Sequence, residues 1–277
     1  DQAADTSGIY VNDGSPLIVG NYISTNRAGD YLGNNHAVYF GANADGVVLG
    51  SATYGQGNVI GQNNDLSLVF MATGGNHFIR GNYIGTTYDS GVWRDLDSAN
   101  HGLFIGAAGN LTVGGTHVGG VGPASINEGN YFAFYNGGGL AAIFVTDGSP
   151  TIQGNYIGTN RAGDALGNNY GVYIATGTDN LTLGGSAYGQ GNVLGFSSGY
   201  QVWYFCNAGS QVIKGNFIGT TYDSGVWRDL GPANHGIYVD GSGTLVIGGV
   251  STGGSGPQSI HEGNYIIYVS ILILTEG

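Results

Sequence analysis

Short apolar segments recur along the chain, separated by Gly, Asn and Asp. Each segment is three to five residues long and rich in Ile, Val, Tyr and Phe. This composition is typical of β-strands, and no stretch shows the longer periodic spacing that an amphipathic helix requires. The pattern predicts eight strands, at residues 9–11, 38–40, 68–70, 103–105, 143–145, 172–174, 202–204 and 237–239.

A short motif follows each predicted strand. Gly favours a sharp turn because it adopts positive φ without strain, and Asn tolerates left-handed geometry. Asn side chains in successive turns also form amide ladders. We therefore expect a turn and a stacked Asn in every unit. The motif is Gly-Asn, then Tyr, Phe or Val and an apolar residue, and it occurs eight times, beginning at Gly20, Gly57, Gly81, Gly129, Gly154, Gly191, Gly215 and Gly263.

A longer repeat contains these units. Residues 9–142 align with residues 143–276 without a gap at an offset of 134, and about half of the aligned positions are identical. The motif TNRAGD at Thr25 recurs at Thr159, and IGTTYDSGVWRDL at Ile84 recurs at Ile218. A strand this short buries its apolar face only when it stacks on copies of itself, so the repeats predict a solenoid.

The predicted fold class is all-β, a right-handed parallel β-helix of about eight coils. We expect one domain across residues 1–277, with super-repeats at residues 9–142 and 143–276. Strands of successive coils should lie about 4.8 Å apart. Equivalent residues of the two super-repeats, such as Ile9 and Ile143, should therefore share one sheet, four coils apart.

Two kinds of coil alternate along the chain. One reads GNYIGTNRAGDALGN, beginning at Gly154, and the other carries LGGSAYGQGN, beginning at Leu183. This alternation resembles the secreted bacterial right-handed parallel β-helix repeat proteins. The resemblance implies a pectate-lyase-like solenoid and a secreted or cell-surface location. It also implies a role as an adhesin, a stalk or a surface array, on an architecture shared with polysaccharide lyases and epimerases.

The charge balance excludes one class of partner. The chain has 6 Lys and Arg residues against 18 Asp and Glu residues, a net charge of -12. No basic stripe is present to displace counterions from phosphates, so we expect no nucleic-acid binding. No apolar stretch reaches the length of a membrane-spanning helix, so we expect no membrane insertion. The single Cys206 follows an aromatic run and is expected to be a buried thiol.

The cationic residues are duplicated, which argues against catalysis. A catalytic site in a solenoid is normally present once, so we interpret them as structural and expect no catalytic residue. No His, Cys or carboxylate spacing suggests a metal, and no cofactor is expected. His101 and His235 occupy equivalent positions and are expected to stack or to bond a turn. The cations fall into three pairs 134 residues apart: Arg27 and Arg161, Arg80 and Lys214, Arg94 and Arg228.

One loop combines two carboxylates with an aromatic side chain. Asp89 and Asp95 flank Trp93 and Arg94, and the second copy repeats this arrangement. A sugar site with a stacking Trp is one interpretation, since glycoside hydrolysis needs two carboxylates. The other, which we favour, is a self-contained loop in which Arg94 pairs with an Asp and Trp93 folds onto the rod.

The middle residues of the predicted strands form a second pattern. Seven of the eight are aromatic, while their neighbours are apolar and mostly aliphatic. Side chains alternate between the two faces of a strand, so the aromatic residues should form an outward column. The column is either a ladder that stacks on itself or a contact face for a neighbouring rod or a glycan. Its members are Tyr10, Tyr39, Phe104, Phe144, Tyr173, Trp203 and Tyr238.

The C-terminal stretch 266–274 is the most apolar and β-prone part of the chain. Neither end shows a capping pattern, and Gly277 aligns with Ile143, so a second molecule should continue the coil in phase. The alternative is that the tail contacts a domain missing from a fragment. The expected assembly residues are the aromatic column together with Ile266, Ile267, Tyr268, Val269, Ile271, Leu272, Ile273 and Leu274.

These patterns together predict an extracellular structural protein, a rod that assembles head to tail with itself into filaments or surface arrays. The alternative is a carbohydrate-binding adhesin or surface module with glycan partners. A polysaccharide lyase or hydrolase ranks third, because the cations are duplicated rather than gathered in one site.

Overall fold

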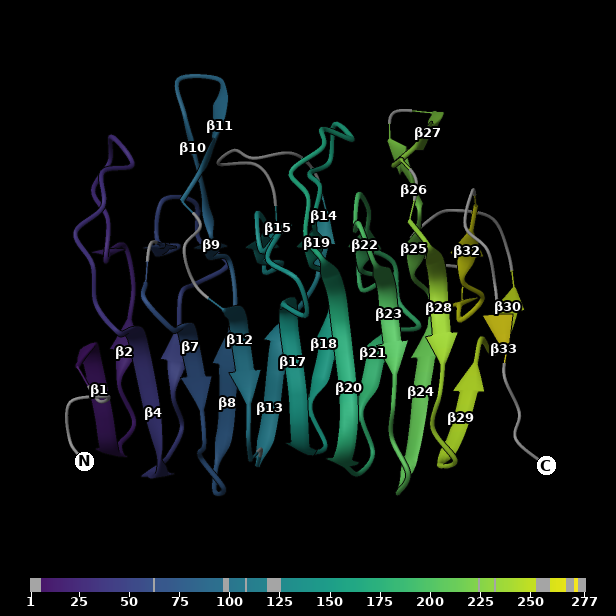
Figure 1. Cartoon of the computed structure of the whole chain (residues 1–277), viewed down its shortest axis with the longest axis horizontal. Coiled ribbons are helices and arrows are strands. Elements are labelled where there is room, and N and C mark those ends of the chain that lie inside the picture. The colour runs from purple at the N-terminus through teal and green to yellow at the C-terminus, as the bar shows by residue number, and fades with distance from the viewer. Residues whose placement is uncertain are drawn as a thin grey trace.

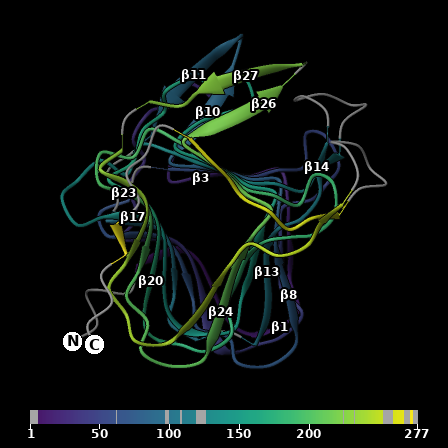
Figure 2. The same ribbon diagram turned by 90° about the vertical axis from the view of Figure 1, so that its right-hand side faces the viewer.

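The computed structural model describes residues 6–61, 63–96, 100–107, 109–118, 126–223, 225–231, 233–252, 260–267 and 272–273. In these residues the chain winds into a parallel β-helix whose coils follow one another along a rod (Figure 1). Viewed along the rod, each coil has three sides (Figure 2). Each side is one parallel sheet, so the predicted fold class is confirmed.

The first sheet contains all eight strands that the apolar segments predict. Successive strands pair in parallel, and the sheet is formed by β1 (Ser7–Gly14), β4 (His36–Ala44), β7 (Leu66–Phe70), β12 (His101–Ile105), β17 (Ala141–Gly148), β20 (Tyr170–Thr178), β23 (Tyr200–Tyr204), β28 (His235–Val239) and β33 (Leu272–Ile273). Ile9 of β1 and Ile143 of β17 lie four strands apart in this sheet, as the repeat predicts.

The other two sheets have eight strands each. The second is formed by β2 (Leu17–Ile18), β5 (Val48–Leu49), β8 (Asn76–Ile79), β13 (Asn110–Gly114), β18 (Thr151–Gln153), β21 (Thr182–Gly184), β24 (Ser210–Lys214) and β29 (Thr244–Ile247). The third follows the Gly-Asn motif and is formed by β3 (Tyr22–Ile23), β6 (Val59–Ile60), β9 (Tyr83–Ile84), β16 (Tyr131–Phe132), β19 (Tyr156–Ile157), β22 (Val193–Leu194), β25 (Phe217–Ile218) and β32 (Tyr265–Ile266).

One apolar core runs the length of the rod. Alternation along each strand sends one set of side chains inward, such as Val38 of the first sheet, Leu49 of the second and Ile60 of the third. All three are fully buried, and their equivalents in neighbouring coils extend the same cluster. Each coil therefore buries its apolar face against the coils on either side, as a solenoid requires.

The predicted Asn ladder is present and fully hydrogen-bonded. In each step Nδ2 of one Asn donates to Oδ1 of the Asn in the next coil, as from Asn58 to Asn82 at 2.9 Å. The remaining N–H of that amide donates to a carbonyl of the previous coil, as from Asn58 to Ile18. The ladder runs through Asn21, Asn58, Asn82, Asn130, Asn155, Asn192, Asn216 and Asn264.

The glycine of the motif has two different roles. Gly81 has φ near 69°, the turn conformation that we expected in every coil. Gly57 and Gly191 do not adopt positive φ, and a Cβ there would collide with the carbonyl oxygen of Gly81 and Gly215 respectively. The expectation of positive φ in every copy is therefore wrong. Alternate coils need glycine because the backbones approach closely.

Within the described residues four antiparallel hairpins extend from the coils, and the sequence pattern did not predict them. Two project beyond the third sheet, as Figure 2 shows: β10 (Thr86–Asp89) with β11 (Val92–Asp95), and β26 (Thr220–Asp223) with β27 (Val226–Asp229). The other two are formed by β14 (His117–Val118) with β15 (Ile126–Asn127), and by β30 (Ser251–Thr252) with β31 (Ile260–His261).

The described part of the C-terminal stretch continues the coil. Ile266 pairs with Ile218, and β33 pairs in parallel with β28, which places Leu272 opposite Tyr238. The gapless repeat predicts that the residue after Gly277 would lie opposite Tyr238. Leu272 lies there instead, so the prediction that the repeat keeps its phase to the end of the chain is wrong. The connection from Ile266 is six residues shorter than its counterpart between Phe132 and Phe144.

Candidate functional site

The predicted aromatic column lies on the first sheet, with each residue paired in register to the next coil. Tyr173 stacks between Phe144 and Trp203, with ring centroids 4.8 and 4.3 Å apart. Tyr10 and Tyr39 stack at 5.2 Å, and Phe104 lies between Phe144 and the buried Val69. Most of these rings stack face to face on a neighbouring ring, which matches the self-stacking interpretation. A role as a contact face stays a prediction.

A second aromatic ladder runs along the third sheet, and sequence reasoning missed it. Tyr131 stacks against Tyr83 and Tyr156 at 5.2 Å on both sides, with the rings nearly parallel. Phe217 stacks against Tyr265 at 5.0 Å. The sequence signal for this ladder is the third residue of the Gly-Asn motif, which is aromatic in six of its eight copies. In register the ladder reads Tyr22, Val59, Tyr83, Tyr131, Tyr156, Val193, Phe217 and Tyr265.

Val interrupts this ladder once in each super-repeat, and each interruption forms a slot. The first slot lies over Val59 between the rings of Tyr22 and Tyr83. Its volume is about 390 Å³. The walls are two strand spacings apart, about 10 Å, which leaves room for one flat ring at stacking distance from both.

The second slot repeats this arrangement 134 residues later. It lies over Val193, between the rings of Tyr156 and Phe217. Its volume is about 350 Å³. Of these residues only Phe217 differs in type from its counterpart in the first slot, so the repeat carries the cavity with it.

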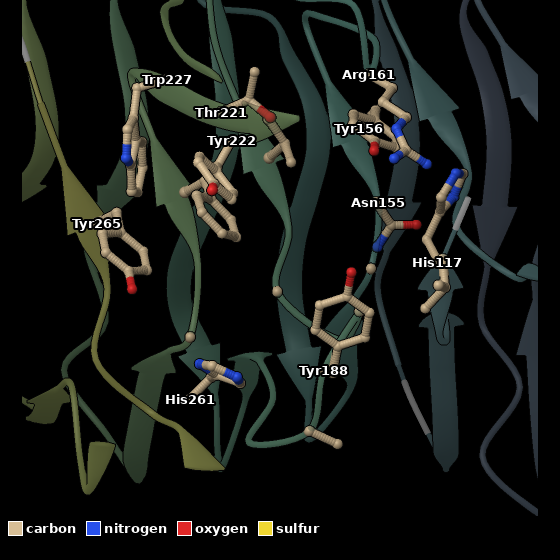
Figure 3. A pocket seen from close by; sticks show the side chains of 18 residues that line it. His117, Asn155, Tyr156, Arg161, Tyr188, Thr221, Tyr222, Trp227, His261 and Tyr265 are labelled. Atoms are coloured by element: carbon tan, nitrogen blue, oxygen red, sulfur yellow. The ribbon is translucent and has the colours of Figure 1, made fainter. Parts of the chain in front are cut away.

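The two tall hairpins, β10 with β11 and β26 with β27, line one end of the first and the second slot respectively. Trp227 of β27 packs against Phe217 and Tyr265, with its ring 4.9 Å from that of Tyr265. Trp93 packs in the same way, 4.9 Å from Tyr131, so the expectation that it folds onto the rod is confirmed. Figure 3 shows Trp227 and Tyr265 on one side of the second slot, with Tyr156 facing them across it.

An ion pair spans each slot. Arg27, which follows β3, donates to Asp89 of the β10 hairpin at 3.0 Å and so connects the first coil to the third. Arg161 and Asp223 make the equivalent pair across the second slot. Asp89 of this loop pairs with Arg27 of another coil, so the loop is not self-contained. An Asp partner for Arg94 stays a prediction. The two recurring motifs TNRAGD and YDSGVWRD contact each other.

His117 lines only the second slot. Its ring lies edge-on to Tyr156, 4.8 Å away, and neither ring nitrogen has a hydrogen-bond partner in the described structure. Burial, and to a smaller extent the charge of Arg161, lower the pKa of His117 to about 4. The imidazole is therefore neutral at neutral pH, with nitrogens able to bond a ligand.

The tyrosine hydroxyls of the ladder also stay neutral. Burial raises the pKa of Tyr83 to about 12 and raises the pKa of Tyr131 and Tyr156 as well. The slots therefore combine apolar ring faces with neutral hydroxyls and one ion pair at the rim. Such an arrangement suits a ring that is apolar on its faces and polar at its edge.

The remaining candidate residues have structural contacts. Arg80 pairs with Glu128 and Lys214 with Glu262, which agrees with the interpretation of the duplicated cations as structural. His101 accepts a hydrogen bond from Ala141 N–H and contacts Phe144, and His235 stacks on Tyr200, both as expected.

Cys206 is a buried core thiol. Within the described ranges, no three His, Cys, Asp or Glu side chains gather as metal ligands do. No helix in that part of the chain has the length and apolarity needed to cross a membrane.

The predicted C-terminal assembly residues are described only in part. Ile266 is half-buried and packs against the core, and Ile267 is also half-buried. The backbone of Leu272 and Ile273 forms β33. The other four predicted residues lie outside the described part of the chain: Tyr268, Val269, Ile271 and Leu274.

Comparisons of the chain with protein-family models, curated proteins and solved structures give no match.

Proposed function

We propose that this chain is a carbohydrate-binding rod of the secreted bacterial β-helix repeat type, which holds one sugar ring in each slot. The observation that carries the proposal is the duplicated gap in the aromatic ladder at Val59 and Val193. Each gap places two aromatic faces about two strand spacings apart. A sugar ring between them restores the stacking on both sides.

The polar groups around each slot favour a sugar over an aromatic ring. The pyranose faces carry C–H groups that stack on aromatic faces, while the hydroxyls lie around the edge. At the edge of the second slot stand the Arg161–Asp223 pair, Thr221 and Tyr188. An apolar aromatic ligand would desolvate these groups without bonding them, which costs free energy. A nucleotide is disfavoured by the net charge of -12.

Binding rather than catalysis suits the carboxylates of the slots. Among the described lining residues of the first slot, Asp89 is the one carboxylate, and it is bonded to Arg27. Glycoside hydrolysis uses two carboxylates that flank the bond to be cleaved. We therefore propose a binding module that works outside the cell, where polysaccharides are accessible.

Filling the gap in the ladder tests the proposal. Val193→Tyr places a ring where six of the eight coils already carry one, so the rod should fold and the second slot should close. We expect Trp fluorescence titrations with malto-, cello-, xylo- and chitohexaose to show sugar binding by the wild type. Two sites should be seen in the wild type, one in the Val193→Tyr variant and none in the Val59→Tyr, Val193→Tyr double variant.

The matched control is Val212→Tyr, the same change on the outward face of β24, away from both slots. This variant should bind as the wild type does. Absence of binding to all four sugars and to a printed glycan panel, or equal binding by the double variant, would contradict the proposal. Binding only to aromatic peptides or free aromatic compounds would point to a different ligand.

A second proposal, head-to-tail assembly, rests on the last described coil. Ile247 of β29 occupies the inward position of the second sheet, where Leu183 and Ile213 are fully buried, yet it is 41% exposed. An apolar core position that no described coil covers favours a further layer of strands. We propose that a second copy of the chain supplies that layer.

Light scattering tests the assembly proposal. The wild type should grow in mass with concentration, whereas Ile247→Lys should remain monomeric because it places a charge in the joint. Val246→Lys is the matched control, since Val246 is exposed on the same strand and faces outward. A wild type that stays monomeric at high concentration would contradict assembly and leave the sugar proposal intact.

A further inference from the structure

We infer that each slot takes the terminal ring of a glycan chain, inserted edge first, so that the two slots of one rod hold the ends of two separate chains. This inference rests on the proposed function. It concerns which part of a glycan is recognised, and it follows from the orientation of the slot walls and from where each slot is closed.

The orientation comes from the ladder itself. Tyr131 and Tyr156 stack with an angle of 8° between their planes, and Phe217 and Tyr265 with an angle of 13°. Rings that stack on one another from coil to coil have their planes across the rod axis. A ligand ring that lies parallel to Tyr156 and Phe217 therefore also lies across the axis.

The floor and one end of the second slot are closed by the rod. Val193, almost fully buried, forms the floor. The Arg161–Asp223 pair, with Thr221 beside it, stands at the end nearer the tall hairpin. A ring substituent that points in either direction meets protein.

The other end is closed by the loop that carries Tyr188. Two hairpins hold this loop, because His117 N–H donates to the carbonyl of Gly189 at 2.8 Å and His261 N–H donates to that of Ser186 at 2.9 Å. Figure 3 shows Tyr188 at this end of the slot, with its hydroxyl directed toward the space between the walls. The remaining opening faces away from the sheet.

A sugar inside a 1,4-linked chain carries its two links on opposite sides of its ring. Such a ring needs two exits from the slot, whereas the slot offers one. A terminal ring needs only one. A chain that runs along the rod is also excluded, because it would have to pass through the ring of Tyr156 or Phe217. The rest of the chain therefore points outward.

The two slots consequently act on different chain ends. Val59 and Val193 lie four strands apart in the third sheet, which corresponds to about 19 Å along the rod. A surface that presents many chain ends at this spacing engages both slots, and the second binding event is then intramolecular. Branched or densely grafted short chains are the expected targets, rather than the middle of long fibres.

A comparison of short and long chains of the same sugar tests the inference. Each of the four hexasaccharides is compared with the long polymer of the same sugar and linkage at equal monosaccharide concentration, with Trp fluorescence as the readout. For every sugar that binds, the hexasaccharide should be more potent in proportion to its larger number of chain ends. The Val59→Tyr, Val193→Tyr double variant should respond to neither form.

Equal potency of polymer and hexasaccharide per monosaccharide, or a stronger polymer, would overturn the inference while the sugar-binding function stands. A response of the double variant equal to that of the wild type would show that the slots are not the site and overturn both proposals. No binding of any sugar would overturn the proposed function itself.

Discussion

The two slots are lined by equivalent residues of the two super-repeats, but the rod packs against their walls to different extents. Tyr156, a wall of the second slot, is 8% exposed because Tyr131 covers its other face, whereas Tyr22, its counterpart in the first slot, is 48% exposed. The side chain of Arg161 is 36% exposed and that of Arg27 is 77% exposed. The same motif thus gives a buried wall or an exposed one, depending on the coil that packs behind it.

The end loops differ in the same way. In the second slot the loop around Tyr188 is bonded by hairpins on both sides, through the backbone of His117 and His261. The corresponding loop of the first slot carries Tyr54, which is more exposed than Tyr188. A preorganised site loses less side-chain entropy on binding, so we expect the second slot to bind more tightly than the first.

The largest expected difference concerns the wall tyrosines. Tyr156→Ala removes a buried ring that stacks on Tyr131 and contacts His117, and it should destabilise the rod by about 3–4 kcal/mol. Tyr22→Ala removes a half-exposed ring and should cost less than about 1 kcal/mol. Urea unfolding measures both. Tyr→Phe at the same positions is the control and should change little. Equal losses would show that the two slots are supported alike.

The second difference is a pH dependence confined to the second slot. His117 has a pKa of about 4 in the folded rod against an ordinary value of 6.5. Between these values the unfolded chain binds the additional proton, so stability falls as the pH is lowered from 6.5 to 4. The full effect is up to about 3 kcal/mol. The first slot has no equivalent residue among those that line it.

The variant His117→Phe isolates this contribution, because a phenyl ring can keep the edge-on contacts with Tyr131 and Tyr156. The difference in unfolding free energy between wild type and variant should change with pH from 7 to 4 and should be flat above pH 7. A difference that is constant over the whole range would contradict the lowered pKa of His117. Sugar binding at the first slot should not respond to the variant.

The smallest expected difference concerns the ion pairs. Asp223→Asn removes the charge from a half-buried pair and should weaken sugar binding at the second slot about fivefold. Asp89→Asn affects a pair whose Arg27 is largely exposed, and the change at the first slot should be within about twofold. Calorimetry on rods with the other slot filled by Tyr resolves each effect. A larger loss at the first slot would reverse the order of the two sites.

The fold could be predicted from the sequence because every coil carries the same local signals. Short strands, inward aliphatic residues and the Gly-Asn turn are local signals, and the same register serves every coil. Asn58 and Asn82 align for the same reason that Val38 and Leu68 do. A solenoid has little choice of topology once its strands and turns are known.

The slots did not follow, because they depend on contacts between different coils. Arg27 and Asp89 are 62 residues apart and skip one coil, and nothing local says which loop a hairpin will meet. One signal was available: TNRAGD and YDSGVWRD recur together, at the same separation, in both super-repeats. The hairpin of β14 and β15, which brings His117 to the second slot, has β30 and β31 as its repeat counterpart, and the sequence pattern did not predict either hairpin.

The Asn ladder fixes the spacing of the coils along the rod. Each amide between the two ends of the ladder is bonded to the coil before and the coil after, as Asn155 is to Val113 and Asn192. An insertion of part of a coil would leave a buried amide without a partner, at about 1–3 kcal/mol. Gene duplication can therefore lengthen such a rod only in whole coils. The distance between binding positions then grows in steps of about 4.8 Å. The 134-residue repeat corresponds to an extension by four whole coils.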